Sequence, residues 1–196
     1  MCSEIRIYFE GHRLLKPGFS LFFSDLRDLA TRRRCKFELI ASKSGEEACR
    51  DFETALKTHP SAWNILLKDS EGPFSAQLAP NLCNRRNWKK SSANSIFWMV
   101  EMMEAWFHAD IDKVADYYGA TFKRNALKPN PAVEAISKRD LTSGLKRATK
   151  DTPKGDYFEH KTEHGPALLA VINPALVCAA AQNCARLFNS VREKLA

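Results

Sequence analysis

The 196-residue sequence lacks several features that would place it in a familiar class. No apolar stretch approaches the roughly 18 residues that a transmembrane helix needs, so a membrane-spanning protein is not expected. The start shows no basic segment followed by an apolar one, so no secretion signal is expected. The six cysteines include no C-x-x-C pair, and we expect reduced, mostly buried thiols. These absences favour a cytoplasmic protein.

Motifs for two common kinds of catalysis are also missing. The sequence has no glycine-rich Walker A loop for nucleotide binding, no G-x-S-x-G and no recognisable Cys-His pattern for nucleophilic catalysis. What it does have is the ordinary composition of a globular domain, with 44% hydrophobic and 27% charged residues. Lys and Arg number 30 against 23 Asp and Glu, which gives a formal net charge of +7.

Strand and helix patterns alternate along the N-terminal part of the chain. Short apolar runs predict strands over 4–9, 36–41, 63–67 and 95–100, and helical spacing predicts helices over 19–29 and 44–58. This alternation predicts an α/β fold with a mostly parallel sheet flanked by helices. We expect residues 1–118 to form this core and residues 119–196 to form a basic, mostly helical C-terminal part packed on it. Helices are predicted there over 137–149, 165–172 and 174–195.

Residues 72–94 contain two prolines and four asparagines and are predicted to form a long loop. From 72 to 100 there is no acidic residue, so this stretch carries +4. Its cations surround one aromatic residue, in the order Arg85, Arg86, Trp88, Lys89 and Lys90. Phosphate contacts from the cations and base stacking on the ring would suit single-stranded nucleic acid. A solvated loop or a protein-binding loop is an equally good interpretation.

Carboxylates gather where the predicted strands end. Glu10 follows the first strand, Asp69 and Glu71 follow the third, and Glu104 lies just after the fourth. Ligands of open parallel sheets bind beyond these ends, and carboxylates crowded there repel one another unless a cation lies among them. Oxygen donors without His or Cys suit Mg²⁺ or Mn²⁺. Each acid alone is better explained as a turn or helix-capping residue, but the combination favours a metal site.

The same residues resemble a known domain. An apolar strand ending in Glu10-Gly11, and a later strand ending in Asp69-Ser70-Glu71, are similar to the TOPRIM domain of topoisomerases, primases and OLD-type nucleases. Segments 7–11, 67–73, 103–110, 130–134 and 152–157 more closely resemble an uncharacterised bacterial TOPRIM-like family. Members of that family are usually encoded beside an ABC-type ATPase, in loci for anti-phage defence.

The resemblance implies roles for individual residues. Glu10 would be the general acid/base or a metal ligand, Asp69 and Glu71 would hold Mg²⁺, and Glu104 would be a further ligand. A cation should also face the negative charge that develops on a phosphodiester, and Lys154 and Lys138 are the candidates, although a solvated surface charge is the simpler interpretation of either. His164 is a candidate proton carrier.

Three functions remain open at this point. The first is a Mg²⁺-dependent nuclease acting on RNA or DNA with an ABC-type ATPase in phage defence. The second is a non-catalytic TOPRIM-like subunit that docks the ATPase, and the third is a nucleic-acid-binding module. The charge distribution favours the nuclease: residues 72–100 carry +4 and residues 123–161 carry +5, whereas acids collect at strand ends.

Overall fold

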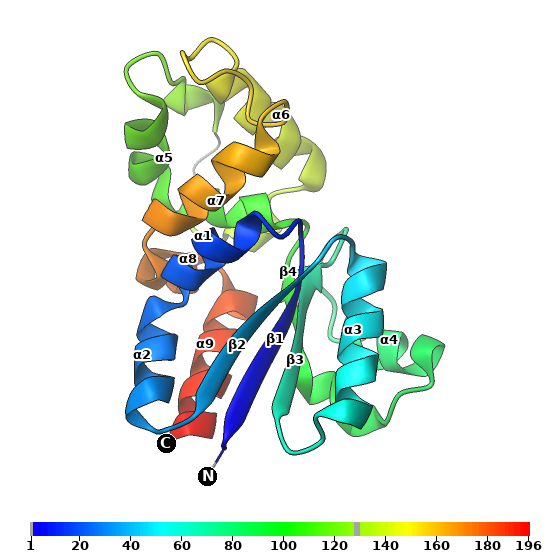
Figure 1. Ribbon diagram of the computed structural model, residues 1–196. Coiled ribbons are helices and arrows are strands. Elements are labelled where there is room, and N and C mark those ends of the chain that lie inside the picture. The colour runs from blue at the N-terminus through cyan, green and yellow to red at the C-terminus, as the bar shows by residue number, and fades with distance from the viewer. Residues whose placement is uncertain (1, 128–129) are drawn as a thin grey trace.

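A computed structural model describes residues 2–127 and 130–196 and shows an α/β architecture (Figure 1). Four parallel strands form one sheet in the order β2-β1-β3-β4. The strands are β1 Glu4–Glu10, β2 Lys36–Ser42, β3 Trp63–Asp69 and β4 Ile96–Met99. The predicted fold class is therefore confirmed, with small shifts at the strand ends.

Helices cover both faces of the sheet (Figure 1). The first face carries α1 Leu15–Phe22, α2 Ser24–Arg32 and α9 Gln182–Leu195, and the second carries α3 Gly45–Thr58 and α4 Leu78–Arg86. Alternate strand residues point to opposite faces. Ile7 and Phe9 belong to the larger hydrophobic cluster on the first face, whereas Tyr8 and Leu66 belong to the smaller cluster on the second. Because both faces are covered, the middle of β1 and β3 and the whole of β4 are apolar and buried, whereas the edge strand β2 is mostly half-buried.

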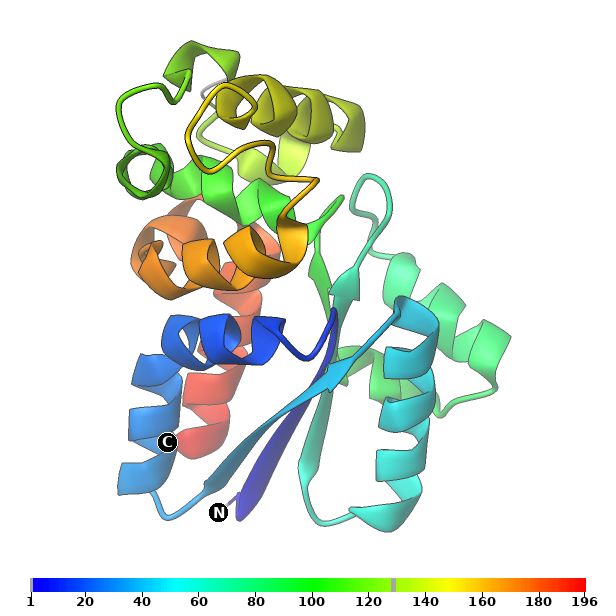
Figure 2. The same ribbon diagram turned by 45° about the horizontal axis from the view of Figure 1, so that its top comes forward.

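The remaining helices lie mostly beyond the carboxyl ends of the strands (Figure 2). They are η2 Met103–Asp110, α5 Ile111–Tyr118, η3 Arg124–Ala126, η4 Val133–Ala135, α6 Lys138–Thr149, α7 Lys161–Val171 and α8 Pro174–Ala180. The larger hydrophobic cluster includes residues on both sides of position 118, and Phe22 meets Phe188 with ring centroids 5.7 Å apart. The division at 118 stays a prediction.

Two predicted helices are each a pair of helices in the structure. The predicted helix 19–29 breaks at Phe23 into α1 and α2, and the predicted helix 174–195 breaks at Ala181 into α8 and α9. Phe22 stacks on Trp106 and meets Phe23 edge to face, so the break lets consecutive helices wrap around one aromatic core. Apolar spacing continues across such a break and does not reveal it.

The prediction of a long loop over 72–94 is wrong. This stretch contains α4 and the 3₁₀-helix η1 Lys90–Ser95. Pro80 lies in the first turn of α4, where the missing N–H has no partner to lose, and Asn87 ends the helix in a left-handed conformation with φ of 53°. The residues that suggested a loop are thus start and stop signals of a helix.

Helices α1 and α7 cross in very close contact. A Cβ built on Gly18 would lie 2.4 Å from the carbonyl oxygen of Pro166, so only glycine allows this approach. The crossing holds the start of α7 beside the end of β1, where Leu15, Lys161 and Glu10 line one cavity. Among the described helices, none alone is long and apolar enough to cross a bilayer, and α7 and α8 pass such a test only as a pair bent by 95°.

Candidate metal centre

Three predicted acids meet at the carboxyl end of the sheet. Glu10 ends β1 and Asp69 ends β3, and these strands are neighbours in the sheet. Glu71 follows two residues later. One carboxylate oxygen from each residue lies within 4.8 Å of the other two, and we call these three residues the acid cluster. An all-oxygen donor set of this size fits Mg²⁺ or Mn²⁺.

Glu10 is held by the backbone around it. Its Oε2 atom accepts a hydrogen bond from the Asp69 backbone N–H at 3.3 Å and lies 3.8 Å from Lys68 Nζ. The N-terminus of α3 also approaches it, and a Cβ built on Gly45 would lie only 2.7 Å from Oε2. The glycine leaves room for the carboxylate at the electropositive end of a helix.

Asp69 is half-buried and is fixed by one hydrogen bond. The backbone N–H of Met103 donates to its Oδ1 atom at 2.9 Å. Burial raises the pKa of Asp69 well above its ordinary value, and the negative charges of Glu104 and Glu10 raise it further. An ionised Asp69 is therefore destabilised in its present surroundings, and a bound cation would relieve that destabilisation.

Glu71 lies on a strained backbone. It has φ of 60°, and Glu101, which follows β4, has φ of 61°. The two turns are joined, because the Glu71 N–H donates to the Glu101 carbonyl at 3.2 Å and Ser70 Oγ accepts from the Glu101 N–H at 2.8 Å. Left-handed backbone in residues other than glycine is uncommon and clusters at functional sites. The Glu71 carboxylate is exposed and forms an ion pair with Lys138.

Glu104 does not belong to the acid cluster, contrary to its predicted role as a metal ligand. It is fully buried, and its Oε1 atom accepts hydrogen bonds from Tyr157 Oη at 2.8 Å and Lys161 Nζ at 2.7 Å. Its Oε2 atom has no hydrogen-bond partner among the described residues. We call Glu104, Tyr157 and Lys161 the closed network. These contacts give the buried Glu104 side chain a structural role.

Lys161 is the functional candidate that the sequence did not indicate. Burial alone would lower its pKa, but Glu104 and Asp69 raise the pKa of Lys161 above its ordinary value, so the side chain stays charged. It also lines a cavity of about 290 Å³ that opens beside the acid cluster. That cavity is lined by Glu10, Gly11, His12, Leu15, Lys43, Asp69, Met103, Lys161 and Thr162.

The cation that the sequence favoured, Lys154, lies elsewhere. Its Nζ atom is 4.6 Å from the centre of the Tyr117 ring, and Lys161 takes the position beside the acids. His164 is buried and shares a hydrogen bond of 2.9 Å with Tyr118 Oη, and burial lowers its pKa. Neither side chain is placed for the catalytic role suggested by the sequence.

The predicted nucleic-acid contact is largely used for packing. Trp88 meets Phe52 edge to face at 5.1 Å, and its indole nitrogen is buried in the smaller hydrophobic cluster. Arg86 forms an ion pair with Glu46 on α3. Arg85, Lys89 and Lys90 remain exposed. Trp88 is therefore half-buried and partly used for packing, and the nucleic-acid contact stays a prediction.

Comparison with known sequences identifies the family to which the chain belongs. Neither the curated proteins nor the solved structures give a match. A family profile described as Domain of unknown function (DUF4276) matches residues 11–192, which begins directly after Glu10 and spans nearly the whole chain. The chain belongs to this family, Domain of unknown function (DUF4276).

Proposed function

We propose that this protein is a nuclease that hydrolyses phosphodiester bonds of RNA or DNA with the help of Mg²⁺ or Mn²⁺. The observation that carries the proposal is the convergence of Glu10, Asp69 and Glu71 from neighbouring strand ends, beside a cavity that Glu10 and Asp69 line. A bound divalent ion would stabilise charge on the phosphate and lower the pKa of an attacking water. The oxygen donors, the destabilised Asp69 and the open cavity all fit that chemistry.

The chain's own residues would divide the remaining work. Asp69, fixed by the Met103 N–H, is the best-positioned ligand, and Glu71 can swing from Lys138 because both side chains are exposed. Glu10 lies beside the cavity and is held at the N-terminus of α3, where it can act as a ligand or exchange a proton with a bound water. Lys161 offers a fixed positive charge to a phosphate oxygen.

A relationship to TOPRIM domains is part of this proposal. Support comes from the parallel sheet and from the position of Glu10 and the Asp69-x-Glu71 pair at neighbouring strand ends. The proposed partner is an ABC-type ATPase in anti-phage defence, and its support is the resemblance of the sequence motifs. Co-purification of the two proteins when they are expressed together tests the partnership directly.

One observation favours a second function, a non-catalytic subunit that docks the ATPase. A lysine lies beside each of three acids at this edge: Lys68 beside Glu10, Lys138 beside Glu71 and Lys161 beside Glu104. Lysines can neutralise carboxylates without a metal ion. In that case the acids would be part of a charged docking surface, and their substitution would weaken the partnership rather than hydrolysis.

The deciding experiment measures cleavage and metal binding together. Total tRNA, single-stranded DNA and plasmid are incubated with the protein and Mg²⁺, Mn²⁺ or EDTA, with and without the ATPase, and Mn²⁺ affinity is measured by calorimetry. Glu10→Gln and Asp69→Asn should each lower cleavage by about 10³-fold, equivalent to several kcal/mol of lost charge stabilisation, and weaken Mn²⁺ binding.

Matched controls are Glu53→Gln and Asp116→Asn, which remove exposed carboxylates that also pair with lysines. Both should keep full activity and Mn²⁺ affinity. Unchanged Mn²⁺ affinity and unchanged defence in the Glu10 and Asp69 variants would overturn the nuclease proposal. Loss of ATPase binding without loss of hydrolysis would establish the docking function instead.

A further inference from the structure

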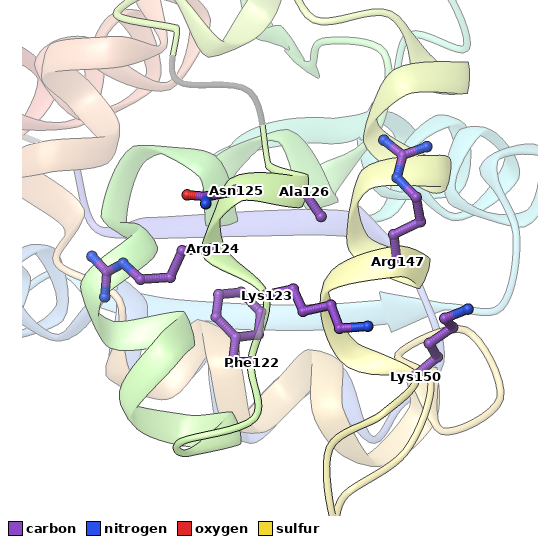
Figure 3. A pocket seen from close by; sticks show the side chains of 7 residues that line it. All are labelled: Phe122, Lys123, Arg124, Asn125, Ala126, Arg147 and Lys150. Carbon is purple, nitrogen blue, oxygen red and sulfur yellow. The ribbon is translucent and has the colours of Figure 1, made fainter.

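A second open cavity lies in the helical part of the molecule, at the opposite end of α6 from the acid cluster. Its volume is about 670 Å³, and it is lined by Phe122, Lys123, Arg124, Asn125, Ala126, Arg147 and Lys150 (Figure 3). Four of these side chains are cationic. We call this cavity the basic groove.

The cations of the basic groove come from two segments. Arg147 and Lys150 lie at the end of α6, and Lys123 extends toward them from the segment that follows α5, whereas Arg124 extends the other way (Figure 3). Cations at a helix C-terminus stabilise the helix dipole, which accounts for Arg147 by itself. It does not account for Lys123, which comes from another part of the chain and adds charge to the same opening.

The basic groove has unbalanced positive charge. Lys123 pairs with Asp151 and Arg124 pairs with Asp112, but Arg147 and Lys150 have no ion-pair partner among the described residues. The two existing pairs are exposed, and exposed pairs contribute little to stability. An anion that enters the groove would therefore find two uncommitted cations and a third held by a weak competitor. Phe122 and Ala126 also line the groove.

Helix α6 connects the basic groove to the acid cluster. At its first turn, the Lys138 side chain pairs with Glu71 and the Lys138 N–H donates to Glu101 at 3.1 Å. Its last turn carries Arg147, and Lys150 follows directly. The helix has 12 residues, which at 1.5 Å per residue gives a length of about 18 Å. This separation is several nucleotides along a strand, so one strand could contact both places.

We propose that the basic groove binds the phosphate backbone of a nucleic-acid strand whose scissile phosphate lies at the acid cluster. The inference rests on the proposed nuclease function and adds where its substrate is held. Phosphate contacts by Arg and Lys fix the position of a strand without selecting its sequence. The groove would thus place the strand, and the acid cluster would cut it.

The test measures binding in EDTA, so that it depends on neither metal nor cleavage. The probe is a fluorescein-labelled single strand of about 12 nucleotides, as DNA and as RNA, followed by anisotropy over a range of salt concentrations. Arg147→Gln/Lys150→Gln should lower the affinity at least tenfold and reduce the salt slope by about 1.4, the value for two lost phosphate contacts.

Two control pairs remove the same charge elsewhere. Arg32→Gln/Arg33→Gln changes exposed cations at the end of α2, and Lys89→Gln/Lys90→Gln changes the exposed cations near α4. Arg32→Gln/Arg33→Gln should bind the probe as the wild type does, and Lys89→Gln/Lys90→Gln should lose less affinity than the groove variant. Equal affinity of the groove variant and the wild type, or a loss confined to the Lys89/Lys90 variant, would overturn the proposal. So would displacement of the probe by an equal concentration of inorganic phosphate, which would identify a pocket for single anions.

The same variants separate this proposal from the nuclease proposal. If Glu10→Gln abolishes cleavage and the groove variant binds normally, the nuclease stands and the groove proposal fails. If the groove variant loses binding while the wild type and Glu10→Gln both fail to cleave with Mg²⁺ or Mn²⁺, the nuclease proposal fails and the groove remains a nucleic-acid-binding site.

Discussion

Two groups of charged side chains lie at the same edge of the sheet, and they differ in how their charge is compensated. In the closed network, Glu104 is fully buried and receives hydrogen bonds from Tyr157 and Lys161. In the acid cluster, Asp69 and Glu10 face a cavity, and the pKa of Asp69 is raised because burial and neighbouring acids oppose its charge. The charge of Glu104 is paired within the fold through its Oε1 atom, whereas the charge of Asp69 is left for a ligand to compensate.

This difference assigns the two neighbouring groups to different tasks, one to stability and the other to function. A buried charge must be paired, because an unpaired one is strongly destabilising. A charge that faces a cavity can remain poorly compensated, because the free energy that it costs is recovered when a cation binds. We therefore expect substitution of Glu104 to affect folding, and substitutions in the acid cluster to affect chemistry.

The sharpest test of this contrast is Glu104→Ala. Removing the buried carboxylate leaves Tyr157 Oη without its acceptor and Lys161 without its counter-charge, so we expect a loss of about 3 kcal/mol in the free energy of unfolding. Urea denaturation measures it. Glu10→Gln should stay within about 0.5 kcal/mol of the wild type. The contrast fails if Glu104→Ala is as stable as Glu10→Gln.

A second test displaces Glu10 without changing it. In Gly45→Ala the new Cβ would stand 2.7 Å from Glu10 Oε2 and 2.8 Å from Lys68 Cε, so the carboxylate must move. We expect cleavage to fall by up to about 100-fold and Mn²⁺ affinity to weaken, while alanine keeps α3 stable. Gly72→Ala is the control, because nothing lies within 4 Å of its Cβ position. Equal activity of both variants would show that the position of Glu10 is unimportant.

The third test should change stability in the opposite direction from the first. Asp69→Asn removes a negative charge that burial, Glu104 and Glu10 all oppose, so the variant should be more stable than the wild type. An increase of about 1 kcal/mol would raise the melting temperature by about 2–4 °C in a chain of this size. The measurement is a thermal melt in EDTA. A melting temperature below that of the wild type would place Asp69 with the closed network instead.

The smallest effect concerns His164, whose ring lies 6.5 Å from that of Tyr157. Burial lowers the pKa of His164 below the ordinary value of 6.5, so the unfolded chain takes up this proton more readily than the folded one. Stability should therefore decrease as the pH falls below about 6.5. His164→Gln should flatten that decrease in melts recorded from pH 8 to pH 5. An unchanged pH profile would mean that other groups cause the acid sensitivity.

The sequence was sufficient for the sheet and for part of the site. Parallel strands bring their carboxyl ends to one edge, so Glu10 and Asp69 could be placed together from their positions after apolar runs. Lys161 could not be found in this way, because it reaches Glu104 only through the packing of α7 on α1. The packing of Trp88 was missed for a related reason, since its neighbours in the chain are polar but its neighbour in space is Phe52. Local sequence patterns predict where strands end, but they do not predict which side chains pack together from distant parts of the chain.

The crossing of α1 and α7 has a consequence for how this chain can evolve. Gly18 touches neither the acid cluster nor the basic groove, yet any larger residue would drive α1 against the Pro166 carbonyl, which lies 2.4 Å from its Cβ position. The displaced helices are those that follow Glu10 and begin with Lys161. In a saturation mutagenesis screen, position 18 should therefore be as intolerant as a catalytic residue, although it takes no part in the chemistry.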